Sequence, residues 1–176
     1  QSKNFNWGGQ GNISLNYNIA NMLKASSILE TGVAYGWSSL SFLLSLNERN
    51  IGQLTSIDMP FYGTKNEKDI GCVVPYHLRQ RWALLRMADK DAIPKVFRKT
   101  HLIDLCHYDS DKSYNGKIWT LPRLWGHLRS GGILICDDVS DNLAFKDFSE
   151  QINFEPIVIN TYDTQVLKHV GILIKP

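Results

Sequence analysis

The sequence SILETGVAYGWS, residues 27–38, has the pattern of a buried strand, a glycine turn and the first turn of a helix. Residues 27–32 form a short, largely apolar run that ends at Gly32, which predicts a strand. In residues 37–46, leucines at helical spacing share one face, which predicts a helix. A strand, a tight turn and a helix make up the first unit of an α/β sheet.

The same alternation of strands and helices continues along the chain. We predict an amphipathic helix in residues 13–23 and a long, functional loop in 59–75. Further strands are predicted at 53–58, 82–87, 101–108 and 133–136, with an antiparallel pair at 156–159 and 170–174. Further helices are predicted at 88–97, 113–128 and 141–151, the second interrupted by Pro122 and stopped by Gly131 and Gly132. This order predicts an α/β fold, a Rossmann-like doubly wound sheet with helices on both faces.

The composition is that of an ordinary globular domain. The 176 residues include 43% hydrophobic and 20% charged residues, which excludes general disorder. A net charge of +2 gives no footprint for nucleic acid, and no apolar run is long enough to span a membrane. Three cysteines without a CxxC motif argue against a disulfide framework, so a cytoplasmic location is expected. We expect an N-terminal helical segment (1–26) on a single core (27–176), and the choice between monomer and homo-oligomer stays open.

The residues at the strand ends indicate a nucleoside cofactor. Gly32 and Gly36 let the backbone approach a ligand, and the helix that follows offers N–H groups to an anionic end. Asp58 ends the next predicted strand, where a carboxylate can accept both hydroxyls of a ribose. A dinucleotide fingerprint would need a glycine where Ala34 stands, which disfavours NAD. The bland alternative is that the two glycines serve only a tight turn.

These landmarks resemble those of class I S-adenosylmethionine (SAM)-dependent methyltransferases. The resemblance rests on Glu30-x-Gly32-x-x-x-Gly36-x-Ser38, on Asp58, and on Gly131–Asp138 (GGILICDD). The stretch YDSDKSYNG, residues 108–116, is similar to a motif of the small O-methyltransferases, including the macrocin and cephalosporin-tailoring relatives and catechol O-methyltransferase. The resemblance implies a seven-stranded sheet of order 3-2-1-4-5-7-6 with the last strand antiparallel.

The resemblance also implies roles for individual residues. Glu30, Gly32 and Gly36 would line the methionine part of the cofactor, with Ser38 near its carboxylate. Asp58 would hold the ribose, Asp89 would lie beside the adenine amine, and Asp109 would also face the cofactor.

Asp109, Asp137 and Asp138 match positions at which metal-dependent members bind a divalent cation. Three carboxylates at neighbouring strand ends repel one another unless a cation lies among them, and all-oxygen ligands select Mg²⁺, Ca²⁺ or Mn²⁺. Magnesium is therefore the expected metal. The alternative is that Asp137 and Asp138 are capping or cofactor-facing acids without a metal.

Lys112 is the candidate general base. A metal and a sulfonium nearby would lower the pKa of Lys112, so that the neutral amine could take the proton of a substrate hydroxyl. The alternative is a solvated lysine at a helix start. His107 is expected to be structural, and Cys106 and Cys136 to be buried packing residues rather than a redox pair.

The function expected is methyl transfer from SAM to a hydroxyl of a small molecule. The acceptor pocket would be built from the N-terminal segment and the loop 59–75, with Tyr35, Phe61 and Tyr62 as candidate aromatic contacts and the tryptophans Trp37, Trp119 and Trp125 in helix packing. Two alternatives stay open: a NAD-binding oxidoreductase, and a non-catalytic scaffold that keeps the fold as a cofactor sensor.

Overall fold

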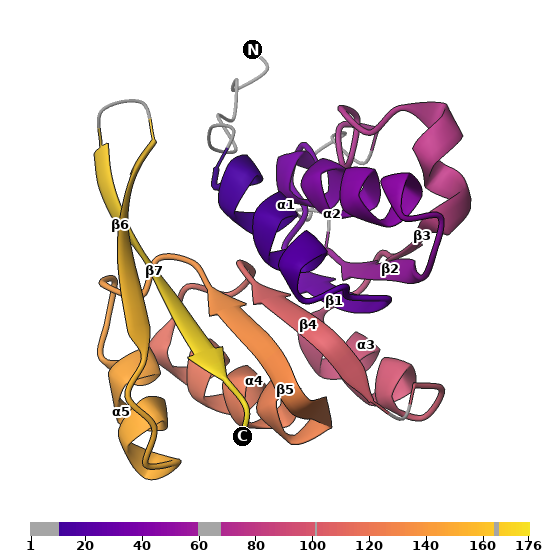
Figure 1. Cartoon of the computed structure of the whole chain (residues 1–176). Helices are drawn as coiled ribbons and strands as arrows, with labels where there is room; N and C mark the ends of the chain where they lie inside the picture. Colours follow the sequence, from indigo (N-terminus) through magenta and orange to yellow (C-terminus); the bar gives the residue numbers. More distant parts are fainter. Residues whose placement is uncertain (1–10, 60–67, 101, 164–165) are drawn as a thin grey trace.

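The computed structural model describes residues 11–59, 68–100, 102–163 and 166–176. A seven-stranded sheet of order β3-β2-β1-β4-β5-β7-β6 runs through its centre (Figure 1). The five strands β3, β2, β1, β4 and β5 are parallel, and β7 runs antiparallel to both β5 and β6. The predicted strand order and the antiparallel C-terminal pair are confirmed. The strands are β1 (Ser27–Thr31), β2 (Gln53–Ile57), β3 (Trp82–Leu85), β4 (Ile103–Tyr108), β5 (Leu128–Cys136), β6 (Ile157–Asp163) and β7 (Val166–Ile174).

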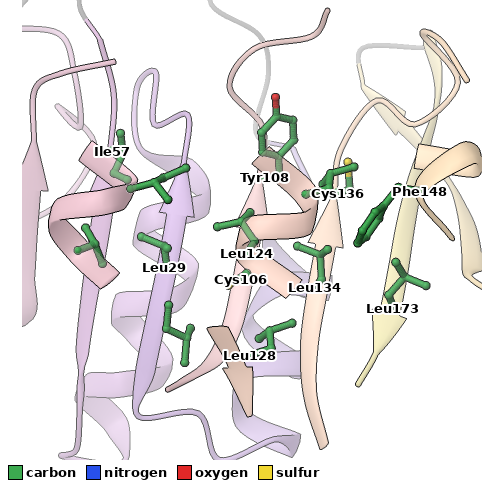
Figure 2. Packing of buried hydrophobic residues seen from close by; sticks show 14 of the residues in the cluster. Leu29, Ile57, Cys106, Tyr108, Leu124, Leu128, Leu134, Cys136, Phe148 and Leu173 are labelled. Atoms are coloured by element: carbon green, nitrogen blue, oxygen red, sulfur yellow. The ribbon is translucent and has the colours of Figure 1, made fainter. Parts of the chain in front are cut away.

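Helices cover both faces of the sheet, and each face has its own apolar core. One core joins α1 (Ile13–Met22), α2 (Trp37–Glu48) and the short 3₁₀ helix η1 (Tyr76–Arg81) to one face. The other joins α3 (Asp89–Phe97), α4 (Tyr114–His127) and α5 (Ala144–Gln151) to the opposite face. Figure 2 shows the second core, where Leu124 and Phe148 from the helices meet Leu29, Cys106 and Leu134 from the strands. The predicted doubly wound architecture is confirmed.

The predicted bounds of α4 are close to the observed ones, but the interruption predicted at Pro122 and the stop predicted at Gly131 and Gly132 are wrong. The helix continues through Pro122 and ends at His127, because Leu121 and Leu124 are fully buried and packing outweighs the lost backbone bond. Gly131 and Gly132 lie inside β5 instead, where the register against β4 shifts between Ile103 and Leu105. A Cβ on Gly132 would come within 3.1 Å of the Asp104 carbonyl oxygen. The glycine pair therefore serves an irregularity of the strand, not a helix stop.

The cysteines behave as predicted for packing residues. Cys106 and Cys136 are fully buried in neighbouring strands as free thiols. Burial raises the thiol pKa of both well above the ordinary value, so neither is a reactive thiolate. Within the described ranges, no helix is long and apolar enough to cross a membrane.

Asp104 joins the three strands β1, β4 and β5 at the side of the sheet where these parallel strands begin. Its Oδ2 accepts bonds from the Ser26 and Ser27 amides at 2.7 and 2.9 Å, and its Oδ1 accepts from Arg129 Nε at 2.6 Å. Burial alone raises the pKa of Asp104, but these bonds outweigh it and hold the pKa below 3.8. The ionised carboxylate therefore stabilises the folded state.

Replacing Asp104 by alanine should lower the free energy of unfolding by about 2–3 kcal/mol at neutral pH, because buried donors lose a charged acceptor. Since the folded pKa is depressed, the contribution is present above the unfolded pKa and is lost as the pH falls through the lower folded value. Urea unfolding at neutral and acidic pH measures both effects. Glu155→Ala, at an exposed carboxyl, is the control, and equal losses from the two variants would contradict the prediction.

Candidate functional site

A cavity of about 680 Å³ opens at the carboxyl ends of the central parallel strands. This edge is where open α/β sheets bind ligands, and the volume suits a small-molecule ligand. Most of the predicted site residues line the cavity: Gly32, Ser38, Asp58, Asp89, Asp109, Lys112, Asp137 and Asp138. Two predicted site residues, Glu30 and Gly36, are not among its lining residues.

The turn after β1 is held by the next strand. Asp58 Oδ2 accepts bonds from the amides of Val33 and Ala34 at 2.7 and 2.9 Å. These two bonds fix the turn to the end of β2. Burial raises the pKa of Asp58, and the two amide bonds oppose that effect. The other oxygen, Oδ1, takes part in neither bond. The carboxylate thus shapes the cavity wall with one oxygen and offers a second to a ligand.

Gly32 is required by the approach of two strands. Its φ is +83°, and a Cβ there would lie 2.4 Å from the Asp109 carbonyl oxygen. Gly36 has φ +93° and precedes α2, and a Cβ there would lie 2.8 Å from the Gly71 Cα. Both glycines permit close backbone contacts. Gly36 shapes the turn from outside the cavity, contrary to its predicted lining role.

Glu30 is buried and is not among the residues that line the cavity, although it was predicted to line the methionine part of the cofactor. The carboxylate is fully buried and accepts bonds from Ser38, Ser39 and Ser56 hydroxyls at 2.5, 2.5 and 2.6 Å. Burial raises the pKa of Glu30, and the serine bonds and His107 oppose it. The Ser38 hydroxyl, predicted near the cofactor carboxylate, is therefore committed to Glu30.

His107 is buried between two carboxylates, in agreement with its predicted structural role. Its Nδ1 lies 3.8 Å from Glu30 Oε1 and its Nε2 lies 3.6 Å from Asp137 Oδ1. Burial lowers the pKa of His107, but Asp137 and Glu30 outweigh it and raise the pKa. The imidazole thus lies between Glu30 of β1 and Asp137, which follows β5.

Asp89 lines the cavity at the start of α3. Its Oδ2 accepts a bond of 2.5 Å from Ser110 Oγ, and this hydroxyl also lies 3.1 Å from Thr31 Oγ1. Burial raises the pKa of Asp89, and the Ser110 bond opposes it. The structure therefore brings Asp89 to the same cavity as Asp58, from the neighbouring strand end.

Lys112 bridges two of the three acids predicted to bind a metal. Its Nζ contacts Asp109 Oδ1 directly and lies 2.7 Å from Asp138 Oδ2. Lys168 Nζ lies 3.3 Å from Asp138 Oδ1. Burial lowers the pKa of Lys112, but Asp109 and Asp138 outweigh it and raise the pKa. With these partners the pKa of Lys112 shifts in the direction opposite to the lowering predicted beside a metal and a sulfonium, which favours the ammonium form.

The carboxylates respond to these lysines in opposite ways. Burial and the nearby Asp137 raise the pKa of Asp109, which Lys112 only partly offsets. Burial also raises the pKa of Asp138, but Lys112 and Lys168 outweigh it and lower the pKa. Of these two carboxylates, Asp109 takes a proton more readily than Asp138.

The arrangement does not fit a divalent cation. Among the described residues, no group of three or more histidine, cysteine, aspartate or glutamate side chains is placed to hold a metal ion. The position between Asp109 and Asp138 is taken by the Lys112 ammonium, which donates to the oxygens that a cation would need. All three acids line the cavity, and Lys112 lies against two of them, Asp109 and Asp138.

The comparisons with known proteins identify the family. The family described as "Methyltransferase domain" matches residues 29–139, well over half of the chain. The chain belongs to this family. No curated protein resembles the sequence closely enough to count as a match. The family membership overturns the alternative of a NAD-binding oxidoreductase.

Solved methyltransferases share the fold. An O-methyltransferase from Bacillus cereus in complex with SAH has a TM-score of 0.74 at 16% identity, over 93% of this chain and 80% of that one. An O-methyltransferase of tomaymycin synthesis from Streptomyces achromogenes, in complex with SAM, has a TM-score of 0.74 at 17% identity, over 93% and 79%. The SAH-bound methyltransferase from Podospora anserina gives 0.64 at 15%, over 93% and 76%. These likenesses establish a common architecture.

Several residues of the methyltransferase cavity were not predicted as site residues. Asn12 and Asn16 reach it from the N-terminal segment, as expected for that segment, but Thr161, Tyr162 and Lys168 come from β6 and β7. Nothing in their sequence pattern marks a hairpin that extends to the cavity. Trp37 and Trp119 line the cavity, although they were predicted to serve helix packing. Tyr35, which was predicted as an aromatic contact, lines it as well. Phe61 and Tyr62 lie outside the described residues.

Replacing Gly32 by alanine should lower the free energy of unfolding by at least about 2 kcal/mol, because the new Cβ meets the β4 backbone and φ is positive. Gly126→Ala is the matched control in α4, where a Cβ meets nothing within 4 Å. Alanine there should be neutral or stabilising by up to about 1 kcal/mol. Urea unfolding of the two variants decides the matter, and similar stabilities would refute the close-approach argument.

Proposed function

We propose that this methyltransferase moves the methyl group of SAM to a hydroxyl oxygen of a small molecule. The observation that carries the proposal is the charge of its cavity, which six carboxylates and three lysines line. SAM has a positively charged sulfonium, which a net negative cavity attracts. The two phosphates of a dinucleotide would be repelled there. Two of the solved relatives are O-methyltransferases in complex with SAH or SAM, which supports the same choice.

The residues present fit SAM. The second oxygen of Asp58 suits the ribose hydroxyls, and Asp89 suits the adenine amine one strand away. The turn at Gly32 and the N-terminus of α2 suit the methionine part, since Trp37 and Ser38 line the cavity where the helix begins. These assignments leave Asp109, Lys112 and Asp138 for the acceptor side.

Lys112 and Asp109 carry the chemistry in this proposal. Bound SAM supplies the methyl group, and the carbon–sulfur pair stays on sulfur, giving S-adenosylhomocysteine (SAH), as the acceptor oxygen bonds to the methyl carbon. The Lys112 ammonium donates a hydrogen bond that holds the acceptor oxygen. The hydroxyl proton passes to the Asp109 carboxylate, which lines the cavity beside Lys112. Lys112 thus acts as a donor and not as the base predicted from the sequence.

The positive charge predicted for magnesium is supplied by Lys112 in this account. The ammonium already compensates Asp109 and Asp138, and Lys168 adds a second cation beside Asp138. No step of the proposed transfer needs a divalent metal.

Asp58→Asn should weaken SAH binding by at least about tenfold, because the amide keeps one acceptor for the turn but replaces the second carboxylate oxygen by a donor. Calorimetric titration with SAH measures the loss. Asp91→Ala, at an exposed aspartate of α3, should bind as the wild type does. Unchanged SAH binding by the Asp58 variant would remove this carboxylate from the cofactor site.

Lys112→Ala should lower kcat by about 10²-fold with any acceptor that the wild type methylates, because one donor to the reacting oxygen is lost. The same variant should bind Mn²⁺ at least about tenfold more tightly than the wild type, since two uncompensated carboxylates then face one point. Paramagnetic resonance of free Mn²⁺ follows the binding, independently of activity.

Lys146→Ala is the control for both effects. It also removes a lysine from a carboxylate, because Lys146 Nζ lies 3.1 Å from Glu150 Oε1 on the exposed face of α5. This variant should keep the wild-type kcat and gain no Mn²⁺ affinity. Tight Mn²⁺ binding by the wild type itself would contradict the role given to Lys112.

A further inference from the structure

Asn16 is a buried polar side chain whose hydrogen bonding is incomplete. It lies in the second turn of α1, is 1% exposed and lines the cavity. Its carbonyl oxygen Oδ1 is buried and has no hydrogen-bond partner within the described part of the chain. A buried acceptor without a donor destabilises the protein, so such groups are rare unless a ligand completes them. The Asn16 oxygen therefore calls for a hydrogen-bond donor that enters the cavity.

The donor can be identified from the chemistry of the proposed cofactor, on which this step rests. SAM and SAH each present three kinds of donor: the ribose hydroxyls, the adenine amine and the α-ammonium of the methionine part. The first two suit the carboxylates of Asp58 and Asp89, which approach from the ends of β2 and β3. The α-ammonium is left, and a neutral amide oxygen is a suitable acceptor for it.

The placement of the carboxylate supports the same assignment. The N-terminus of the twelve-residue helix α2 lines the cavity with Trp37 and Ser38, and the first turn of a helix offers N–H groups to an anion. In an amino acid the carboxylate and the ammonium share one carbon. A ligand whose carboxylate meets the start of α2 thus carries its ammonium near that helix, which packs against α1, and Asn16 of α1 lines the same cavity.

We propose that Asn16 Oδ1 accepts a hydrogen bond from the α-ammonium of the cofactor. Asn16 then selects ligands with a free amino group, and α1 becomes part of the cofactor site as well as of the core. The bond also explains why a polar residue stands beside Ala20, the other buried residue of α1. An apolar residue at position 16 would pack equally well but would leave the ammonium without this partner.

The test compares SAH with its analogue that lacks the α-amino group. We expect the wild type to bind SAH at least about tenfold more tightly than the deaminated analogue. Asn16→Leu, which keeps the size but removes the acceptor, should weaken SAH about tenfold and bind the two ligands equally. Asn16→Asp, which restores an oxygen, should recover the preference for SAH. Calorimetric titration of each folded variant supplies the ratio.

Asn18→Leu is the matched control, because Asn18 lies on the exposed side of the same helix. It should bind both ligands as the wild type does. A wild-type ratio near one, or an Asn16→Leu variant that keeps the wild-type ratio, would overturn the role of Asn16 while leaving the proposed function intact. Failure of the wild type to bind SAH at all would overturn the proposed function and this inference with it.

Discussion

The buried carboxylate of Glu30 is the interaction on which the site geometry depends. It lies at the centre of the sheet and is held by serine hydroxyls from α2 and β2, with His107 of β4 beside it. A charge in the interior is tolerated only when hydrogen bonds and opposite charge satisfy it. Those bonds join β1, β2, β4 and α2 directly below the glycine turn. The strands and the helix that flank the glycine turn are therefore held together through one buried carboxylate.

In the cavity of the methyltransferase, lysine ammonium groups lie against the carboxylates that follow β4 and β5. The acids at the ends of β4 and β5 would repel one another, and Lys112 and Lys168 offset that repulsion while leaving the cavity negative. Such a cavity suits a cationic methyl donor, and it holds the donor's neutral product less strongly after transfer. In the function that we propose, the lysine that neutralises these acids also orients the acceptor oxygen.

Much of the fold could be predicted because it is encoded locally. Apolar runs such as residues 133–136 and leucines at helical spacing gave the elements, and the resemblance to a known family gave their order. Gly131 and Gly132 misled because a glycine pair suits both a helix end and a strand irregularity, and only the register against β4 distinguishes them. The hairpin of β6 and β7 extends further than its apolar residues indicate, because its outer half is polar.

The sequence predicted which residues line the site better than it predicted the role of each. Aspartates at strand ends were correctly placed around one cavity, since parallel strands end at the same edge. The burial of Glu30, the contact of Lys112 with Asp138 and the unpartnered oxygen of Asn16 depend on contacts between segments far apart in sequence, and no local pattern predicts them. The pKa of Lys112 is raised first by Asp109, three residues earlier, and further by Asp138, a residue at another strand end that the local sequence does not bring beside it.

A cavity built for SAM should also bind the product SAH and should not bind a dinucleotide. Calorimetric titration of the wild-type protein with SAH and, separately, with NADH measures both. We expect saturable binding of SAH, at a dissociation constant of about 1–100 μM, and no saturable binding of NADH. Binding of NADH without binding of SAH would contradict it, because the charge argument and the family membership would then both have failed to identify the ligand.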